Sequence, residues 1–179
     1  MISKSVTEGA AEPRIEHSNQ RMFLGKRLVT TLSEDRTFEL WREFMPVRNE
    51  IGRRVGTELY SIEVYPPGYF DEFDPSLGFE KWAAVEVKEA GAVPAGMETI
   101  VVPEGLYGIF LHKGPATEGI RTIQYIFSTW LPASGFLVDG RPHLAVMGDR
   151  YRKDDPDSEE ELWIPIRPNS ERQARGSAL

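Results

Sequence analysis

Hydrophobic residues alternate with polar ones, wholly or in part, in seven segments that are rich in aromatic and β-branched side chains. A period of two residues predicts β-strands. The segments are Arg14 to Leu32, Glu58 to Tyr65, Phe79 to Val87, Glu98 to Val102, Leu106 to His112, His143 to Tyr151 and Glu161 to Ile166. The first segment fits one bent strand or a hairpin, with Gly25 as a bulge.

The connections between these segments predict how the strands pair. Three antiparallel pairs are expected: Glu58 to Tyr65 with Phe79 to Val87, Glu98 to Val102 with Leu106 to His112, and His143 to Tyr151 with Glu161 to Ile166. The second pair is the clearest hairpin, because the turn Pro103-Glu104-Gly105 separates its strands. The 13 residues 66–78 form a long connection that carries Tyr69, Phe70 and Phe73, and they predict a loop that covers a site.

Two further segments have the 3.6-residue period of amphipathic helices. The first runs roughly over residues 34–54, and Pro46 within it predicts a kink or two abutting helices. The second begins after Pro115 and ends near Leu131.

The order strand, helix, strand, strand therefore occurs twice, in repeats of about 14–88 and 97–167. Each repeat has one tryptophan on its helix and one on its last strand: Trp41 and Trp82, then Trp130 and Trp163. This duplication predicts an α+β fold of two β-α-β-β units, related by a pseudo-twofold axis, with an aromatic cleft between them. Residues 1–12 and 169–179 lack periodicity and predict tails around a folded unit of residues 13–168.

Composition narrows the chemistry that this domain can perform. The 179 residues include no cysteine, which excludes disulfides, thiolate nucleophiles and sulfur-bound metals. The formal net charge of −7 argues against a direct nucleic-acid partner or an anionic membrane surface. The three histidines lack metal-ligand spacing and no glycine-rich phosphate loop precedes a helix, so neither a metal nor another cofactor is expected. No signal or membrane-spanning segment is evident, which predicts a cytoplasmic protein.

Several motifs in the second half resemble, in the right order, the GyrI-like small-molecule-binding domain, also called the AraC-type effector-binding domain. They are YGIFLHKGP (Tyr107 to Pro115), WLPASGF (Trp130 to Phe136), RPHLAVMGDRY (Arg141 to Tyr151) and SEEELWIPIRP (Ser158 to Pro168). In the first half FLGKRLVTTL, ELWREF, YSIEVY and FEKWAAVEV look like the longer stand-alone members. The resemblance implies a duplicated β-α-β-β architecture whose central cleft takes lipophilic, often cationic, aromatic molecules. Some members are drug-sensing regulators, some sequester toxins or bind gyrase, and one branch hydrolyses cyclopropane-containing DNA alkylators.

The resemblance also assigns a carboxylate to the cleft, at Glu161. Burial among aromatic rings would raise the pKa of Glu161, and a cationic ligand would offset the cost of desolvation. The alternative is a solvated residue at the inner end of the acidic run 154–160. Glu86 shares a strand face with Trp82 and either points into the same cleft or faces solvent. Ala145 stands where family members often carry a glutamate, which weakens any two-carboxylate mechanism.

Seven aromatic residues are candidates for the walls of the cleft: Trp41, Tyr60, Trp82, Phe110, Trp130, Tyr151 and Trp163. Trp82 and Trp163 are the better candidates, since Trp41 and Trp130 lie on the apolar stripes of helices and are more typical of a core. The hydroxyls of Tyr60 and Tyr151 either orient a ligand or bind a nearby carbonyl.

The preferred hypothesis is a stand-alone protein that captures hydrophobic aromatic or cationic small molecules, with the 66–78 loop as cover. A hydrolase of electrophilic toxins is the alternative, with Glu161 or Glu86 positioning water. A third hypothesis is a protein-interaction module, such as a gyrase inhibitor, with a protein partner on its surface.

Overall fold

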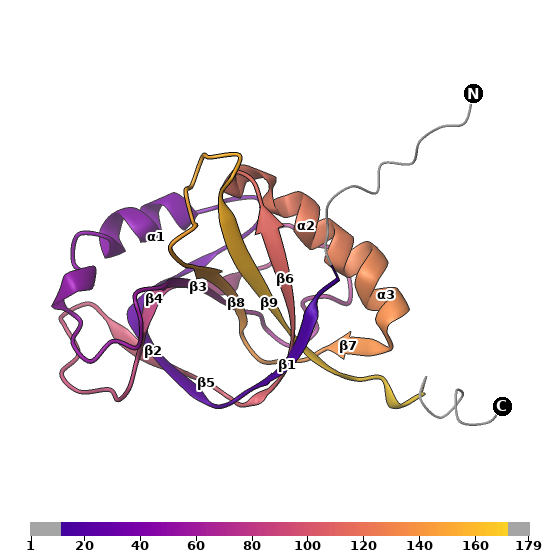
Figure 1. The fold of residues 1–179 in the computed structure, drawn as a ribbon, viewed down its shortest axis with the longest axis horizontal. Coiled ribbons are helices and arrows are strands. Elements are labelled where there is room, and N and C mark those ends of the chain that lie inside the picture. The colour runs from indigo at the N-terminus through magenta and orange to yellow at the C-terminus, as the bar shows by residue number, and fades with distance from the viewer. Residues whose placement is uncertain (1–11, 172–179) are drawn as a thin grey trace.

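The structure is a computed structural model and describes residues 12–171, which form one antiparallel sheet with helices on one face (Figure 1). The strands are β1 (Arg14–Ser18), β2 (Arg21–Thr30), β3 (Leu59–Val64), β4 (Phe79–Val87), β5 (Glu98–Val102), β6 (Gly105–Lys113), β7 (Phe136–Val138), β8 (His143–Met147) and β9 (Glu159–Pro168). The helical segments are α1 (Thr37–Phe44), η1 (Arg48–Glu50), η2 (Ala116–Glu118), α2 (Gly119–Tyr125), η3 (Ile126–Trp130) and α3 (Leu131–Ser134). The strand order is β1-β6-β9-β8-β3-β4-β2-β5, and β7 pairs with β9.

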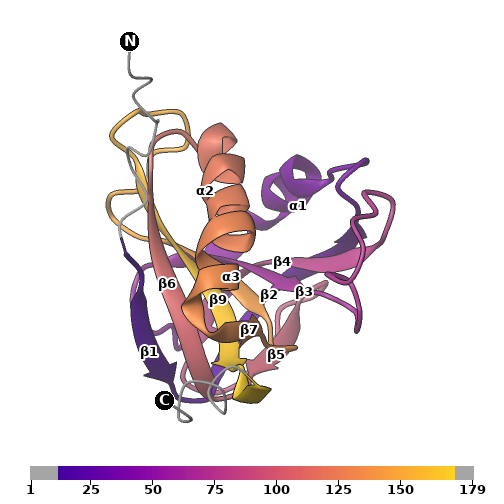
Figure 2. The same cartoon turned by 90° about the vertical axis from the view of Figure 1, so that its right-hand side faces the viewer.

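The predicted duplication is confirmed by the arrangement of the elements. One repeat is β2-α1-β3-β4, the other is β6-α2-β8-β9, and they meet where β3 pairs with β8. Equivalent residues have equivalent partners: Ile62 lies opposite Trp82 in one repeat, and Leu144 lies opposite Trp163 in the other. Both main helices cover the same face, and the two halves of the sheet are turned relative to each other (Figure 2).

The predicted hairpin between residues 98–102 and 106–112 is wrong, because β5 pairs with β2 and β6 pairs with β1 and β9. Residues 14–32 likewise form neither one bent strand nor a hairpin, since β1 crosses to β6 instead of pairing with β2. The strand that precedes each repeat therefore pairs with the other repeat: β1 with β6, and β5 with β2. This exchange covers the outer edges of β2 and β6, which would otherwise present unpaired N–H and C=O groups.

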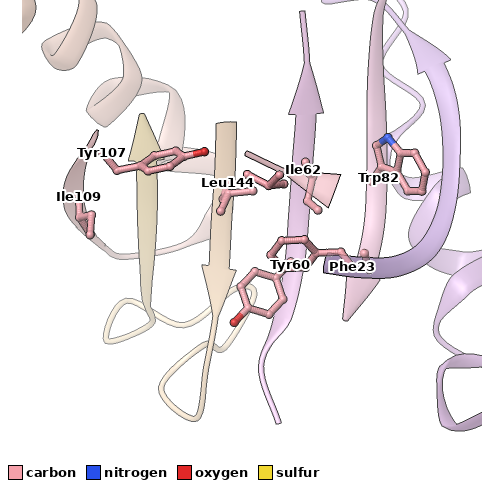
Figure 3. Close-up of a cluster of buried hydrophobic side chains, with 9 residues drawn as sticks. Phe23, Tyr60, Ile62, Trp82, Tyr107, Ile109 and Leu144 are labelled. Atoms are coloured by element: carbon pink, nitrogen blue, oxygen red, sulfur yellow. The ribbon is translucent and has the colours of Figure 1, made fainter. Parts of the chain in front are cut away.

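Hydrophobic cores lie on both faces of the sheet. Under the helices, Leu40 and Phe44 of α1 pack on β2 and β4, while Ile126 packs on β6 and β9. On the face without helices, the curled sheet encloses a third core (Figure 3). Its buried members are Phe23, Tyr60, Ile62, Trp82, Ala84, Val102, Tyr107, Ile109 and Leu144.

Prolines shape both helical regions. The predicted break at Pro46 is confirmed, because α1 ends at Phe44 and the 3₁₀ turn η1 follows. The second helical region continues beyond the predicted end at Leu131, because the π-helical turn η3 leads into α3, with Pro132 in its first turn. Gly135, with φ of 78°, then ends it at a left-handed position.

Gly25 does not form the predicted bulge. It lies in continuous register opposite Ala84 on one side and Glu98 on the other. A glycine is required there for a different reason, the close approach of the neighbouring strand.

Candidate functional site: an aromatic cluster between the repeats

Aromatic side chains from both repeats meet on the helix-covered face, where the end of β3 lies beside the start of β8. Glu63 is opposite His143 in the register of these strands. We call these rings, which belong to β4, β8, η3 and the segment after β3, the inter-repeat cluster. Its members are Tyr65, Tyr69, Phe70, Phe79, Phe127 and His143.

The 66–78 loop spans this cluster from the first repeat to the helix of the second. The Phe70 ring stacks on Phe127 with centroids 5.1 Å apart and planes 18° apart. It also stacks on His143 at 5.5 Å, yet the residue remains 44% exposed. The loop therefore contacts the second repeat through one aromatic ring at the surface of the cluster.

Glu63 supplies a carboxylate at the base of the cluster. It accepts a hydrogen bond from the Tyr65 hydroxyl, and the Lys81 ammonium lies 3.1 Å from its Oε1 atom. Burial alone would raise the pKa of Glu63, but the charge of Lys81 and the Tyr65 hydroxyl hold the pKa below its usual value. Glu63 is ionised and already has a counter-ion.

His143 is a neutral member of the cluster. Burial lowers its pKa to about 4, although the charge of Glu63 acts in the opposite direction. Only 7% of the residue is exposed, and it has no hydrogen-bond partner within residues 12–171. At neutral pH it contributes an uncharged ring.

Glu160 is a second carboxylate on this face, and it lies opposite His112 in the register of β6 and β9. Its strand neighbours Leu162 and Ile164 pack under the second helix, so Glu160 points to the same side. Burial raises the pKa of Glu160, partly offset by the charges of His112 and Lys81. Within the described part of the chain it makes no hydrogen bond and no ion pair. Burial of its hydroxyl raises the pKa of Tyr151, another predicted site residue, and the charge of Glu160 adds to this effect.

Glu161, the carboxylate that the resemblance assigns, lies on the opposite face of β9. Its side chain is 31% exposed, and Arg14 Nη1 lies 3.0 Å from its Oε1 atom. Trp163 Nε1 donates a hydrogen bond of 2.9 Å to its other oxygen. Trp82 and Glu80 repeat this contact at 2.6 Å in the first repeat, as the pseudo-twofold arrangement requires. The role of Glu161 in ligand binding stays a prediction.

Glu86, Tyr60 and Trp163 come together inside the curled sheet, where Arg21 fills the space between them. The Arg21 guanidinium donates hydrogen bonds of 3.0 and 2.7 Å to Glu86 and one of 2.9 Å to the Tyr60 hydroxyl. It lies 5.1 to 5.3 Å from the ring centroids of Phe23, Tyr60 and Trp163. Burial raises the pKa of Tyr60 to about 12. On this face a carboxylate and three aromatic rings surround a position suited to a cation, and the Arg21 guanidinium occupies that position.

Replacing Arg21 with methionine should destabilise the domain by about 2–3 kcal/mol, because the Glu86 side chain is only 16% exposed and would lose its counter-ion. Urea unfolding measures the effect, and the second substitution Glu86→Gln should restore part of it. Arg27→Met is the matched control, since Arg27 pairs with Glu98 and Glu80 at the sheet surface, where all three side chains are more exposed than Arg21 and Glu86, and its loss should matter less. Equal losses of stability in Arg21→Met and Arg27→Met would contradict a special stabilising role for the ion pair between Arg21 and Glu86.

The remaining predicted wall residues lie in the cores under the helices. Phe110 and Trp130 contact each other edge to face at 5.0 Å, and Trp41 contacts Phe44 at 5.8 Å. This agrees with the interpretation of Trp41 and Trp130 as core residues. Sequence reasoning missed the groove residues Glu63, Phe127, His143 and Glu160, although the strand period already placed Glu63 and Tyr65 on the face opposite Tyr60.

The described residues offer no site for a metal ion, because no three His, Asp or Glu side chains within 12–171 are grouped to hold one. In the same range, no helix is both long and apolar enough to span a bilayer.

The fold is that of a domain made of two β-α-β-β repeats, with an aromatic cluster where the repeats meet. The chain belongs to the GyrI-like small molecule binding domain family, which matches residues 11–167. It is 33% identical over 130 residues to the transcriptional regulator BrlR of Pseudomonas aeruginosa, covering 72% of this chain and 45% of BrlR. The chain thus spans less than half the length of that relative.

Solved structures share the fold at low sequence identity. SAV2435 bound to tetraphenylphosphonium matches with a TM-score of 0.66 and 12% identity, over 88% of this chain and 94% of the other. A hydrolase encoded by lin2189 from Listeria innocua matches with a TM-score of 0.55 and 13% identity, over 92% and 96% of the two chains. These likenesses confirm the predicted fold class.

Proposed function

We propose that this protein captures lipophilic aromatic cations in a groove between its repeats, at the inter-repeat cluster, and releases them chemically unchanged. The observation that carries the proposal is Glu160, a partly buried carboxylate on the same helix-covered face as the cluster, which makes no ion pair among residues 12–171. Burial makes its charge unfavourable, and a bound cation would favour the ionised form. A bound cation therefore offsets the free-energy cost of keeping Glu160 ionised, which is uncompensated when no ligand is bound.

The other carboxylates of the two faces are compensated within the chain. On the face without helices, Glu86 pairs with Arg21, Glu161 with Arg14 and Glu80 with Arg27. In the groove, Glu63 pairs with Lys81. A cationic ligand therefore gains most from Glu160.

The inter-repeat cluster supports the aromatic part of the ligand. The Phe70 ring packs against both Phe127 and His143, whose own rings are 6.4 Å apart, and it belongs to a loop with no helix or strand. Withdrawal of Phe70 would expose these two rings to a ligand, and the face of Phe127 would attract a cation by about 0.5–2 kcal/mol. The relative SAV2435 was bound to tetraphenylphosphonium, a cation of this kind.

Calorimetric titration with tetraphenylphosphonium tests the proposal on two adjacent glutamates. Glu160→Gln should weaken binding about tenfold, because one buried charge contact is lost at low effective dielectric. Glu161→Gln, on the opposite face of the same strand, is the matched control and should bind as the wild type does. As pH falls through the raised pKa of Glu160, wild-type affinity should approach that of Glu160→Gln.

The opposite result, weaker binding only in Glu161→Gln, would move the site to the face without helices. Mass spectrometry of the recovered ligand, repeated with a cyclopropane-bearing alkylator, separates capture from hydrolysis. A product whose formation requires Glu63 or Glu160 would favour the hydrolase alternative.

A further inference from the structure

The Arg21 side chain, at the start of β2, is enclosed by a complete set of partners for a guanidinium. Its Nε and Nη2 atoms donate hydrogen bonds of 3.0 and 2.7 Å to the two carboxylate oxygens of Glu86, and Nη2 donates another of 2.9 Å to the Tyr60 hydroxyl. Its Cζ atom lies 5.1, 5.2 and 5.3 Å from the ring centroids of Phe23, Tyr60 and Trp163. Only 16% of the side chain is exposed.

These partners are the groups that recognise a flat organic cation. A carboxylate that accepts two parallel N–H bonds matches the planar fork of a guanidinium, and ring faces attract a cation more strongly where water is excluded. Charge compensation alone would need no more than the carboxylate of Glu86. The rings come from both repeats, since Phe23 and Tyr60 belong to the first and Trp163 to the second, so the arrangement lies where the repeats meet.

The carboxylate of this arrangement does not follow from the duplication of the fold. Trp82 and Trp163 are equivalent in the two repeats, as their register partners show. Glu86 is the fourth residue after Trp82, and the fourth residue after Trp163 is Arg167. A carboxylate at this position is therefore a property of the first repeat, and the repeated architecture does not require it.

We propose that Arg21 is an internal ligand that closes a second cation site, and that the ligands of this site are alkylguanidinium cations. The arginine is covalently attached beside the site, so its effective concentration far exceeds that of a dilute free cation. The site is closed to external cations in the intact protein and becomes available when the arginine side chain is removed. This inference concerns the face without helices and does not rest on the function proposed above.

N-Ethylguanidinium is the matched probe, because it supplies the atoms that Arg21→Ala removes, from Cγ to the guanidinium group. Thermal unfolding followed by circular dichroism measures binding, since a ligand that binds the folded state alone raises the Tm. The Tm of Arg21→Ala should rise with ethylguanidinium concentration and saturate, whereas the wild type should show no such rise. Propylammonium carries the same charge without the planar fork and should need a concentration about tenfold higher.

Two further variants identify the groups that hold the probe. Arg27→Ala removes an arginine that pairs with Glu80 and Glu98 on the same face, but 41% of that side chain is exposed, so its Tm should not respond to ethylguanidinium. Arg21→Ala combined with Glu86→Gln keeps the three rings and loses the carboxylate. This double variant should bind ethylguanidinium about tenfold more weakly than Arg21→Ala does.

Three results would each overturn the inference: a Tm of Arg21→Ala that does not respond to ethylguanidinium, an equal response in the wild type or in Arg27→Ala, and undiminished binding by the double variant. If Arg21→Ala is unfolded on its own, ethylguanidinium should restore the folded circular dichroism spectrum in a concentration-dependent manner. Failure to restore that spectrum counts equally against the site.

Discussion

Replacing Gly25 with alanine should lower the free energy of unfolding by more than about 4 kcal/mol, because the added methyl group has no space. A Cβ atom at this position would lie 2.0 Å from the carbonyl oxygen of Ala83 and 2.7 Å from the Cα atom of Ala84. Both are backbone atoms of β4, so no side-chain rotation relieves the clash. The neighbouring strand would have to move, and the ladder between β2 and β4 would break.

Gly140→Ala is the matched control for this experiment. Apart from its two chain neighbours, no residue has an atom within 4 Å of the place that the new methyl group would take, and this glycine precedes β8 in a connection. Urea unfolding of both variants should show a large loss for Gly25→Ala and nearly wild-type stability for Gly140→Ala. Comparable stability of the two variants would contradict the close approach of β4.

The strands within each repeat were predictable because their signals are local. Residues 79–87 and 98–102 have the predicted bounds, since runs of aromatic and β-branched residues bounded by turn residues predict strands. The tryptophans also revealed the duplication. The exchange of β1 and β5 between the repeats was not predictable, because a turn such as Pro103-Glu104-Gly105 specifies a reversal of the chain and not the partner that each strand then meets.

The sequence predicted the loop that contributes to the candidate site, but not which carboxylate of β9 shares a face with the aromatic cluster. Length and aromatic content identified the 66–78 loop, whose Phe70 bridges the repeats. The family motif identified the strand with the carboxylate, but neighbouring residues of a strand face opposite sides. Glu160 and Glu161 are therefore separated by the sheet, and only the packing of Leu162 under the second helix shows which one faces the groove. The sequence did not predict a role for His143, because a histidine can be assigned to an aromatic cluster only when its neighbours in the fold are known.

Acidification should destabilise the domain through His143. The pKa of this residue is about 4 in the folded state and near 6.5 in the unfolded chain. Its contribution to stability is complete above pH 6.5. Between pH 6.5 and 4, His143 binds a proton in the unfolded state but stays neutral in the folded state. The free energy of unfolding therefore falls as pH falls, by about 3 kcal/mol in total.

His143→Phe isolates this effect, since phenylalanine preserves the stacking on Phe70 and Phe127 and cannot be protonated. Urea unfolding at pH values from 7 to 4 should show wild-type stability falling about 3 kcal/mol further than that of His143→Phe, because carboxylates that titrate in both proteins cancel in the difference. His17→Gln is the control, because His17 is exposed on β1, and it should follow the wild-type curve. Parallel curves for wild type and His143→Phe would mean that His143 accepts its proton inside the folded domain. His143 would then be excluded as the source of the acid sensitivity. A protonated His143 would also repel a cationic ligand at low pH.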